Sequence, residues 1–444
     1  MSDPHSGTSA LHRLIAKRIG VIGTEEAFSL GALIAEVEST GRRVIKANLG
    51  QPDFPLPEHI ADAVIKAIRD GKTTYCDPQG LPELRRAIAV SVGANRGLDI
   101  DPERVVVYPG GRPPIGFAQH AYVEPGDEVV YPTPSYPLFE SFIDYVHATP
   151  VAVPVLEETG FTLSGDGLAP YLSPKTKLVY LNFPSNPTGG VASAGQLAEI
   201  GEVIKVKAHP DVRIYSDEAY EAIVFDGEQH VSIASLPGLE EMTIIATGAS
   251  KTYSWTGGRV GWGIYPTIAE AKIMRRLNIN YFASIPPYNQ IGARVALESP
   301  ESPPAIAAMV EAFQRRRDIV VAGLNAIDGV TCQNPKGAFY VFPNVGGALA
   351  QMGAIEAFEG LAPEVRARTS PATLFQLFLL YRYQVATMDR RSFGVRGSEG
   401  QHFLRLSIAT GEDDLREAID RLAIASKDTE GFADYLESGG RLTL

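Results

Sequence analysis

Cysteine is scarce in this chain. Only two of its 444 residues are cysteine, Cys76 and Cys332, so a disulfide framework is not supported and a reducing compartment fits. Long hydrophobic runs are missing as well. The apolar stretch 374–381 is much shorter than the roughly 20 residues of a membrane span, and we expect it to form a buried helix. Residues 1–18 contain no apolar core of signal-peptide length. These absences predict a soluble, cytoplasmic protein with no membrane partner.

An excess of positive charge is also missing. The chain has 40 Lys and Arg against 52 Asp and Glu, a formal net charge of −12. Because a nucleic-acid-binding protein needs a basic face, this balance argues against a nucleic-acid partner. Hydrophobic residues make up 45% of the chain and charged residues 21%, which is typical of a globular protein. The length exceeds what one hydrophobic core usually supports, so we expect one large and one smaller domain.

The middle of the chain has the pattern of an α/β domain. Short apolar runs that predict strands lie at residues 104–109, 127–132, 176–184, 212–218 and 242–248. Segments with helical spacing, such as 194–208, separate several of these runs. Apolar runs of this kind are typical of buried parallel strands joined by crossover helices.

The last third of the chain has a different pattern. Strands are predicted within 329–345 and 402–410, and helices at 305–325 and 412–426. Residues 352–369 fit neither pattern, and we interpret them as an insertion or a mobile helical segment.

The most informative segment is IIATGASKTYSWTGGRVGWGIYP, in which a strand leads to Lys251 in a glycine-rich loop that also contains Arg259. Small residues let the backbone approach a bound group closely. A buried lysine becomes a nucleophile when desolvation or a nearby cation lowers its pKa, and an arginine can clamp a phosphate. From this segment alone, an exposed lysine on a glycine-rich loop explains the pattern equally well.

Two further polar residues follow predicted strands. Asn186 lies between two prolines in LNFPSNPTGG, and Asp217 ends the strand in RIYSDEAY. Each has a plainer explanation by itself, a structural turn for the asparagine and a cap or an ion pair for the acid. Because ligands bind outside the carboxyl ends of strands in open α/β sheets, the spacing lets Lys251, Arg259, Asn186 and Asp217 converge on one crevice.

Seven motifs, in order along the chain, resemble those of fold-type-I pyridoxal-phosphate (PLP) enzymes of the class I/II aminotransferase family. They are NLGQPDFPLPEHI (48–60), TYCDPQGLPELRRAI (74–88), NFPSNPTGG (182–190), SDEAY (216–220), SKTYSWTGGRVGW (250–262), KGAFYVFPN (336–344) and FLRLS (403–407). The resemblance covers the chain from about Leu14 to Ala425. One such motif would be a weak signal, but seven in the family's order identify the chain as a member.

The resemblance implies a three-layer αβα PLP-dependent transferase fold with a mostly parallel sheet and a smaller α+β domain built from both termini. The implied parts are a disordered N-terminus (1–13), an arm with part of the small domain (14–59), a large PLP-binding domain (60–300) and a small C-terminal domain (301–444).

The resemblance also implies the catalytic residues. Lys251 matches the lysine that holds PLP as a Schiff base and then moves the substrate α-proton. Asp217 matches the carboxylate that pairs with the pyridinium nitrogen and keeps the ring an electron sink. Tyr220 and Asn186 match groups that hydrogen-bond the ring phenolate oxygen, and Tyr136 matches the aromatic that stacks on the ring.

Phosphate and substrate contacts follow from the same resemblance. The matching phosphate contacts are Gly110, Gly111, Ser250 and Arg259. The two glycines are expected to open a helix whose N-terminus favours a dianion. Arg405 matches the arginine that pairs with the substrate α-carboxylate, with Gly50 and Asn186 beside it. Tyr75 matches a tyrosine that reaches the cofactor phosphate of a neighbouring subunit, which implies a homodimer with shared active sites.

Several residues depart from the family pattern. Some aspartate-preferring relatives carry a lysine that binds the distal carboxylate where this chain has Arg112; the arginine either does the same or bonds the phosphate or a neighbouring acid. Arg390 and Arg391 lie in a stretch that is usually rich in Gly and Pro and close to the substrate, so they either bind an extra acid group or belong to a solvated loop. Gly258 replaces a large aromatic, which either opens space near the cofactor or is filled by Trp255.

These features predict a PLP-dependent aminotransferase that moves an amino group between an amino acid, with aspartate or glutamate favoured, and a 2-oxo acid such as 2-oxoglutarate. A PLP enzyme of the same fold with another outcome (lyase, cyclase, decarboxylase or oxidase) is the alternative, because the cofactor stabilises the carbanion and the protein chooses its fate. A ligand-sensing regulator is disfavoured, because the chain leaves no room for an attached DNA-binding module.

Overall fold

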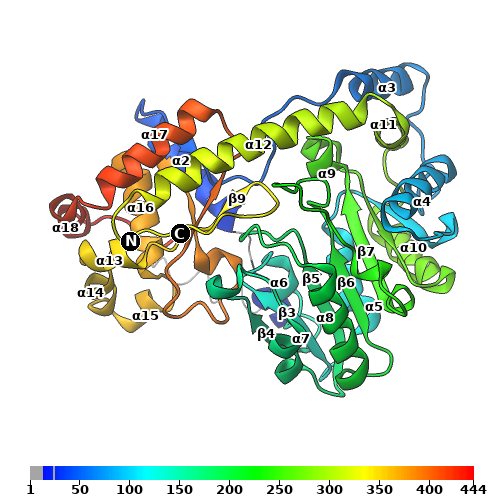
Figure 1. Cartoon of the computed structure of the whole chain (residues 1–444), viewed down its shortest axis with the longest axis horizontal. Coiled ribbons are helices and arrows are strands. Elements are labelled where there is room, and N and C mark those ends of the chain that lie inside the picture. The colour runs from blue at the N-terminus through cyan, green and yellow to red at the C-terminus, as the bar shows by residue number, and fades with distance from the viewer. Residues whose placement is uncertain (1–13, 24–25) are drawn as a thin grey trace.

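A computed structural model describes residues 14–23 and 26–444, so the segment 1–13, expected to be disordered, lies outside the described residues. A seven-stranded sheet in the order β2-β8-β7-β6-β5-β3-β4 forms the centre of the larger half of the molecule (Figure 1). Its strands are β2 (Val105–Tyr108), β3 (Glu128–Thr133), β4 (Thr149–Pro154), β5 (Thr176–Asn182), β6 (Arg213–Asp217), β7 (Thr243–Gly248) and β8 (Gly261–Ile264).

The sheet is mostly parallel, which confirms the predicted fold class. Strands β3 to β7 pair in parallel, whereas β8 runs antiparallel to both β2 and β7. All five predicted strands are present, but β4 and β8 were not predicted. Strand β4 contains Pro150 and Pro154, which are tolerated because it lies at the edge of the sheet. Strand β8 contains Gly261 and Gly263 where apolar side chains would mark a strand.

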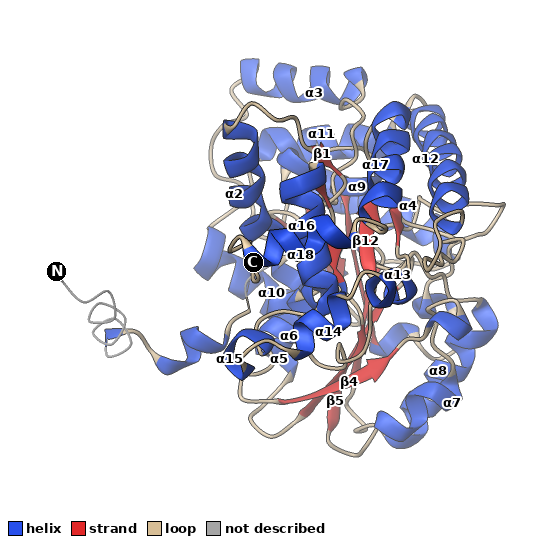
Figure 2. Ribbon diagram, turned by 90° about the vertical axis from the view of Figure 1, so that its left-hand side faces the viewer, coloured by secondary structure: helices blue, strands red, loops and turns tan. Residues whose placement is uncertain are grey.

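Helices cover both faces of this sheet because its strands are apolar on both sides. In β5, Leu178 and Tyr180 pack with the helices α5 and α10, whereas Val179 and Leu181 pack with α8 on the other face. Figure 2 shows these helices on opposite sides of the strands. The helices of this half are α3 (Glu58–Arg69), α4 (Pro82–Arg96), α5 (Pro113–Tyr122), α6 (Leu138–Ser141), α7 (Gly165–Leu168), α8 (Ala194–Lys207), α9 (Ala249–Thr252), α10 (Ile268–Phe282) and α11 (Pro287–Glu298).

Both ends of the described chain share a second hydrophobic core. Apolar residues between Leu30 and Ala47 pack in one cluster with residues between Met309 and Tyr435. Strands β9 (Tyr340–Val341), β11 (Met388–Asp389) and β12 (Leu404–Ser407) form an antiparallel sheet there, and β1 (Ile45–Lys46) pairs with β10 (Val385–Ala386). The helices are α2 (Glu26–Ser39), α12 (Ser302–Asn325), α13 (Gly346–Gln351), α14 (Ala354–Glu359), α15 (Pro363–Arg366), α16 (Pro371–Tyr383), α17 (Glu412–Ala425) and α18 (Thr429–Glu437). The long α12 runs from the large half into this smaller one (Figure 1).

Helix α16 explains the apolar stretch 374–381. Every residue from Pro371 to Leu380 is buried, so the helix is apolar all round because protein surrounds it. None of the described helices is both long and apolar enough to cross a membrane. The segment 352–369 forms α14 and α15, and α14 packs against α16.

Candidate active site

A cavity of about 580 Å³ lies at the carboxyl edge of β5, β6 and β7. Loops that follow these strands form one wall. The opposite wall comes from the second core, through Gly50 after β1, Tyr340 of β9 and Arg405 of β12. Eleven of the fourteen predicted site residues line it: Gly50, Gly111, Arg112, Tyr136, Asn186, Asp217, Tyr220, Ser250, Lys251, Arg259 and Arg405.

Lys251 enters the cavity from the first turn of α9, directly after β7. Its Nζ donates a hydrogen bond to the carbonyl oxygen of Gly50 at 2.5 Å. The same Nζ lies 5.9 Å from the ring centroid of Tyr220 and 5.8 Å from that of Phe339. The amine is therefore held in the cavity by a backbone carbonyl and two aromatic rings.

Asp217 lies at the end of β6, where the strand opens onto the cavity. Burial raises the pKa of its carboxyl to about 7, against the lowering effect of the Ala219 N–H and the Lys251 cation. The N–H of Ala219 donates to its Oδ1 at 3.2 Å. A buried carboxylate with a raised pKa pairs favourably with a cation or an N–H donor that is brought into the cavity.

A network of buried charges, which the sequence pattern did not predict, supports the Asp217 loop from behind. Glu218 is fully buried and accepts hydrogen bonds from Arg96, His230 and Ser232. Although burial opposes its ionisation, Arg96 and His230 lower the pKa of Glu218. Glu218, His230 and Glu221 lie close enough to hold a metal ion, but the guanidinium of Arg96 already pairs with both glutamates. Arg96 therefore neutralises carboxylate charge within this network.

Arg405 reaches the cavity from β12 and is 4% exposed. Its Nη1 donates to Asn186 Oδ1 at 3.0 Å, and its Nη2 donates to the carbonyl oxygen of Asn48. The guanidinium lies 4.4 Å from the ring centroid of Tyr340 and 4.7 Å from that of Phe393. Flanked by rings and anchored by amides, it presents a fixed positive charge to the cavity.

The other end of the cavity is built to receive an anion. Arg112 and Arg259 both line it. The pKa of Arg259 is lowered mainly by burial and also by repulsion from the Arg112 cation. Ser250 contributes to the same wall, and α5 begins at Pro113, directly after Arg112. The helix N-terminus, the hydroxyl and the two guanidinium groups all favour a bound phosphate or carboxylate.

Gly110 lies outside the cavity lining but directly behind Arg259. Its φ is +93°, and a Cβ built there would lie 2.0 Å from Nη2 of Arg259. That nitrogen donates to the carbonyl oxygen of Pro109 at 3.2 Å. A side chain at position 110 would therefore displace the arginine from the anion-binding end.

Tyr75 and Arg390 are not brought into the cavity. Tyr75 is 87% exposed. Arg390 is 1% exposed, and its guanidinium donates to Gln401 Oε1 and Thr133 Oγ1 at 2.8 Å and to the carbonyl oxygen of Gly394 at 2.9 Å. The structure thus differs from the substrate-binding role expected for Arg390, because its donors tie the 390–401 loop to β3.

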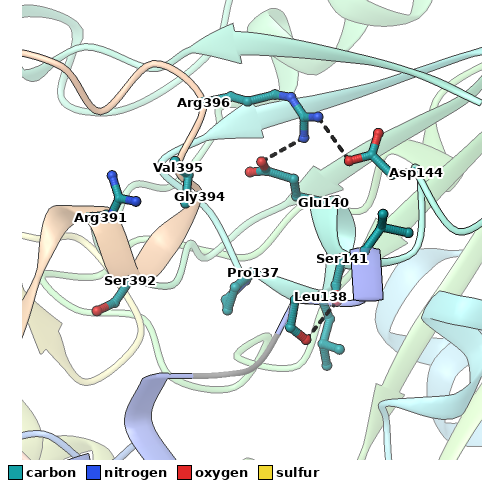
Figure 3. Close-up of a pocket in the computed structure, with 12 residues that line it drawn as sticks. Pro137, Leu138, Glu140, Ser141, Asp144, Arg391, Ser392, Gly394, Val395 and Arg396 are labelled. Carbon is teal, nitrogen blue, oxygen red and sulfur yellow. Dashed lines mark hydrogen bonds and ion pairs between the residues drawn. The ribbon is translucent and has the colours of Figure 1, made fainter. Parts of the chain in front are cut away.

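Arg391 lines a separate cavity of about 140 Å³, shown in Figure 3. Its Nη2 donates to the carbonyl oxygen of Ala367 at 2.6 Å. Across this cavity, Arg396 pairs with Glu140 at 2.8 Å and with Asp144 at 3.0 Å (Figure 3). The two residues from α6 and the turn after it therefore hold the other end of the 390–401 loop.

The structure also decides the effect of Gly258. A Cβ there would lie 2.2 Å from the ring of Trp255, so this indole fills the space of the aromatic that the family usually has at position 258. Tyr340 is a site residue that the sequence analysis missed. It was quoted within the motif KGAFYVFPN, but nothing in the chain order links it to the cavity.

The charges of the cavity identify the kind of ligand that fits. Among the described lining residues, four are basic (Arg112, Lys251, Arg259 and Arg405) and Asp217 alone is acidic. Ligands with a phosphate and a carboxylate would neutralise this excess. A phosphorylated pyridine aldehyde matches the set, since Lys251 offers an amine, Asp217 an acceptor and the α5 end an anion site. The residues present therefore fit PLP.

Comparisons with known proteins agree with this assignment. Residues 42–422 match the model of the family "Aminotransferase class I and II". The chain is 35% identical over 413 residues to an aspartate aminotransferase of Rhizobium meliloti, covering 92% of this chain and 95% of the relative. It is 36% identical over 389 residues to an aspartate/prephenate aminotransferase of Cereibacter sphaeroides, covering 87% and 92%.

Solved structures give the same answer. The crystal structure of an aspartate aminotransferase from Rhizobium meliloti superposes with a TM-score of 0.81 at 34% identity, covering 93% of this chain and 98% of that one. An aromatic aminotransferase from Pyrococcus horikoshii gives 0.78 at 31% identity, covering 90% and 100%. The fold and the cavity are those of an amino-group transferase. The chain belongs to the aminotransferase class I and II family, whose enzymes use PLP.

Proposed function

We propose that this aminotransferase binds PLP through Lys251 and moves an amino group between an acidic amino acid, aspartate or glutamate, and a 2-oxo acid. The observation that carries the proposal is the position of Lys251, which lines one cavity with Asp217, Tyr220 and three arginines. PLP, when bound, supplies the electron sink that makes the substrate α-proton removable.

Each residue has a role that its surroundings support. The Lys251 amine, freed from the cofactor when substrate binds, would carry the proton between the substrate α-carbon and the cofactor. Asp217 would accept a hydrogen bond from the ring nitrogen, and this cationic partner would lower the pKa of about 7 that burial imposes. Tyr220 and Asn186 would donate to the ring oxygen, and Tyr136 would stack on the ring.

Anion contacts would orient both ligands. Gly111, Ser250 and Arg259 would hold the cofactor phosphate at the N-terminus of α5, with Gly110 giving Arg259 its position. Arg405, anchored by Asn186, would pair with the substrate α-carboxylate. Gly50 would contact the same carboxylate through its backbone.

Arg112 supports an acidic substrate. It lines the cavity beside Tyr136, with its Cζ 6.0 Å from that ring centroid. Arg112 lines the same cavity as Arg259 and Arg405, so a substrate with a second carboxylate would meet a third guanidinium group there. The names of the relatives, aspartate and aspartate/prephenate aminotransferase, point to substrates with two carboxylates.

We further propose a cytoplasmic homodimer in which Tyr75 reaches the cofactor phosphate of the neighbouring subunit. Tyr75 is 87% exposed, and it is not among the residues that line the described cavity of its own chain. Both cysteines are free, which fits a reducing compartment.

The test is to incubate the purified, PLP-loaded protein with aspartate and 2-oxoglutarate and to measure oxaloacetate and glutamate. Equal amounts of the two products are expected. The Lys251→Ala variant should lose the visible absorbance of the lysine-bound cofactor and at least about 10³-fold of the rate. The proposal would be wrong if ammonia were released without glutamate, or if the Lys251→Ala variant kept the visible absorbance and the rate of the wild type.

A further inference from the structure

Tyr340 is a second buried tyrosine of the cavity. It lies on β9 of the smaller half, is 1% exposed and lines the cavity with Tyr220. Its hydroxyl lies 2.8 Å from the hydroxyl of Tyr220, which comes from the loop after β6 in the larger half. The pair therefore joins the two walls of the cavity at one hydrogen bond.

The hydroxyl pair limits what Tyr220 can do. A phenol has one proton to donate, and its oxygen accepts as well. When Tyr340 donates to Tyr220, the proton of Tyr220 is left to point into the cavity. A hydroxyl that receives such a bond is also a stronger donor, because chained hydrogen bonds polarise one another.

The ring of Tyr340 contacts another group of the site. The Arg405 guanidinium lies 4.4 Å from its centroid, which is within the range of a cation–π contact. The same guanidinium lies 4.7 Å from the ring centroid of Phe393. The ring therefore limits the planes in which Arg405 can present its donors.

The backbone beside Lys251 is shaped around the Tyr340 hydroxyl. A Cβ on Gly50 would lie 2.2 Å from Oη of Tyr340, so this oxygen needs glycine at position 50. The carbonyl oxygen of Gly50 accepts the hydrogen bond from Lys251 Nζ. One side chain thus touches the environments of Tyr220, Arg405 and Lys251.

We propose that Tyr340 is a positioning residue of the transamination site: its hydroxyl orients Tyr220 as a donor to the bound cofactor, and its ring orients Arg405 toward the substrate carboxylate. This inference rests on the proposed function. Because the hydroxyl and the ring of Tyr340 have different roles, two substitutions can test them one at a time.

Tyr340→Phe removes the hydroxyl and keeps the ring. The weaker donor at Tyr220 should raise the pH midpoint of the visible band of the lysine-bound cofactor by about 0.5–1 unit, the equivalent of one ordinary hydrogen bond. We expect kcat to fall about 5–30-fold, while KM for the amino acid changes less than about twofold because Arg405 is undisturbed. Tyr340→Leu should show the same spectral shift and in addition raise KM for both substrates about 5–10-fold.

The chain offers a matched control in Tyr108 and Tyr265. Their hydroxyls also form a buried pair, at 2.5 Å, and neither residue lines the cavity. Tyr265→Phe should leave the spectral midpoint, kcat and KM at their wild-type values, whatever it does to thermal stability.

The holoenzyme is titrated spectroscopically for all four proteins, and steady-state kinetics follow. A spectral midpoint of Tyr340→Phe equal to that of the wild type, or an equal shift in Tyr265→Phe, overturns the inference while transamination stands. A wild-type protein with no titrating visible band overturns the proposed function and this inference with it. Tyr340→Phe decides the matter by itself if Tyr340→Leu fails to fold.

Discussion

Asp217 combines two properties at the scale of a single residue. It belongs to the cavity, and burial raises the pKa of its carboxyl to about 7. An aspartate in an unfolded chain titrates near about 3.9, so ionised Asp217 costs folding free energy once the pH exceeds that value. The cost is complete above the folded-state pKa. If Asp217 pairs with a cationic ring nitrogen, as proposed, the protein is therefore less stable without the cofactor.

Asp217→Asn should stabilise the cofactor-free protein at neutral and alkaline pH, since the amide carries no charge and keeps an oxygen for the Ala219 N–H. The gain in unfolding free energy is expected to reach a few kcal/mol near about pH 8 and to shrink as the pH falls toward about 4. Urea unfolding of both proteins across this range measures it. A difference that does not change with pH would contradict the expectation.

Asp226 is a control because its carboxyl pKa is shifted in the opposite direction to that of Asp217. A hydrogen bond from Arg317 lowers the pKa of its carboxyl, so its charge stabilises the fold above the unfolded-state pKa. Asp226→Asn keeps a residue type that tolerates the φ of +58° at this position. It should destabilise the protein at neutral pH, and the difference should vanish in acid.

The 390–401 loop shows how an element decides the role of its residues. Arg390 and Arg391 are neighbours in sequence, but one is buried in bonds to its own loop and to Thr133 while the other lines a separate cavity. The loop also holds the segment after β3 through Ser135, whose N–H donates to the carbonyl oxygen of Phe393 at 3.0 Å. Arg390 therefore supports the loop that carries Tyr136.

Arg112→Gln and Arg390→Gln separate these two kinds of arginine. Arg112→Gln should lower kcat/KM for aspartate relative to an apolar amino acid by about 10–100-fold, the value of a charge-assisted hydrogen bond. Arg390→Gln should leave that ratio unchanged and reduce the unfolding free energy by about 1–3 kcal/mol. The hydrogen bonds that the Arg390 guanidinium donates are lost, and this loss outweighs the relief of a buried charge. Kinetics with both substrates and thermal unfolding test the pair. A changed ratio in Arg390→Gln would restore its expected substrate role.

At the scale of the whole molecule, the cavity exists only because two cores meet. The larger half supplies Lys251 and Asp217, and the smaller half supplies Tyr340 and Arg405. Helix α12 connects the halves in sequence, and the Tyr220–Tyr340 hydroxyl pair connects them at the site. In the proposed homodimer, the exposed Tyr75 would reach the site of the second chain.

Mixed dimers test whether Tyr75 works across subunits. Tyr75→Ala and Lys251→Ala chains, each impaired alone, are co-refolded at limiting PLP. In a mixed dimer, the site with Lys251 intact also receives Tyr75 from its partner. Random reassociation should therefore restore about a quarter of wild-type sites. Activity no greater than that of the separately refolded variants would show that Tyr75 does not act in a neighbouring site.

Local chemistry in the sequence determined much of this protein. Apolar strand runs, the positions of Lys251, Asp217 and Asn186 at strand ends, and the glycines before α5 all predicted structure correctly, because strand-end loops in a parallel sheet meet at one edge. The edge strand β4 and the glycine-containing β8 were missed because their side chains do not follow the usual strand pattern.

Only the tertiary structure decided which charged and aromatic side chains face the cavity. Both Arg112 and Arg390 are arginines that the sequence could place at the substrate. In the structure Arg112 lines the cavity, whereas Arg390 is buried and donates to neutral acceptors such as the carbonyl oxygen of Gly394. Trp255 fills the space at Gly258, and Tyr340 meets Tyr220 across more than a hundred residues of chain. Such contacts join distant segments through packing, so no spacing within the sequence specifies them.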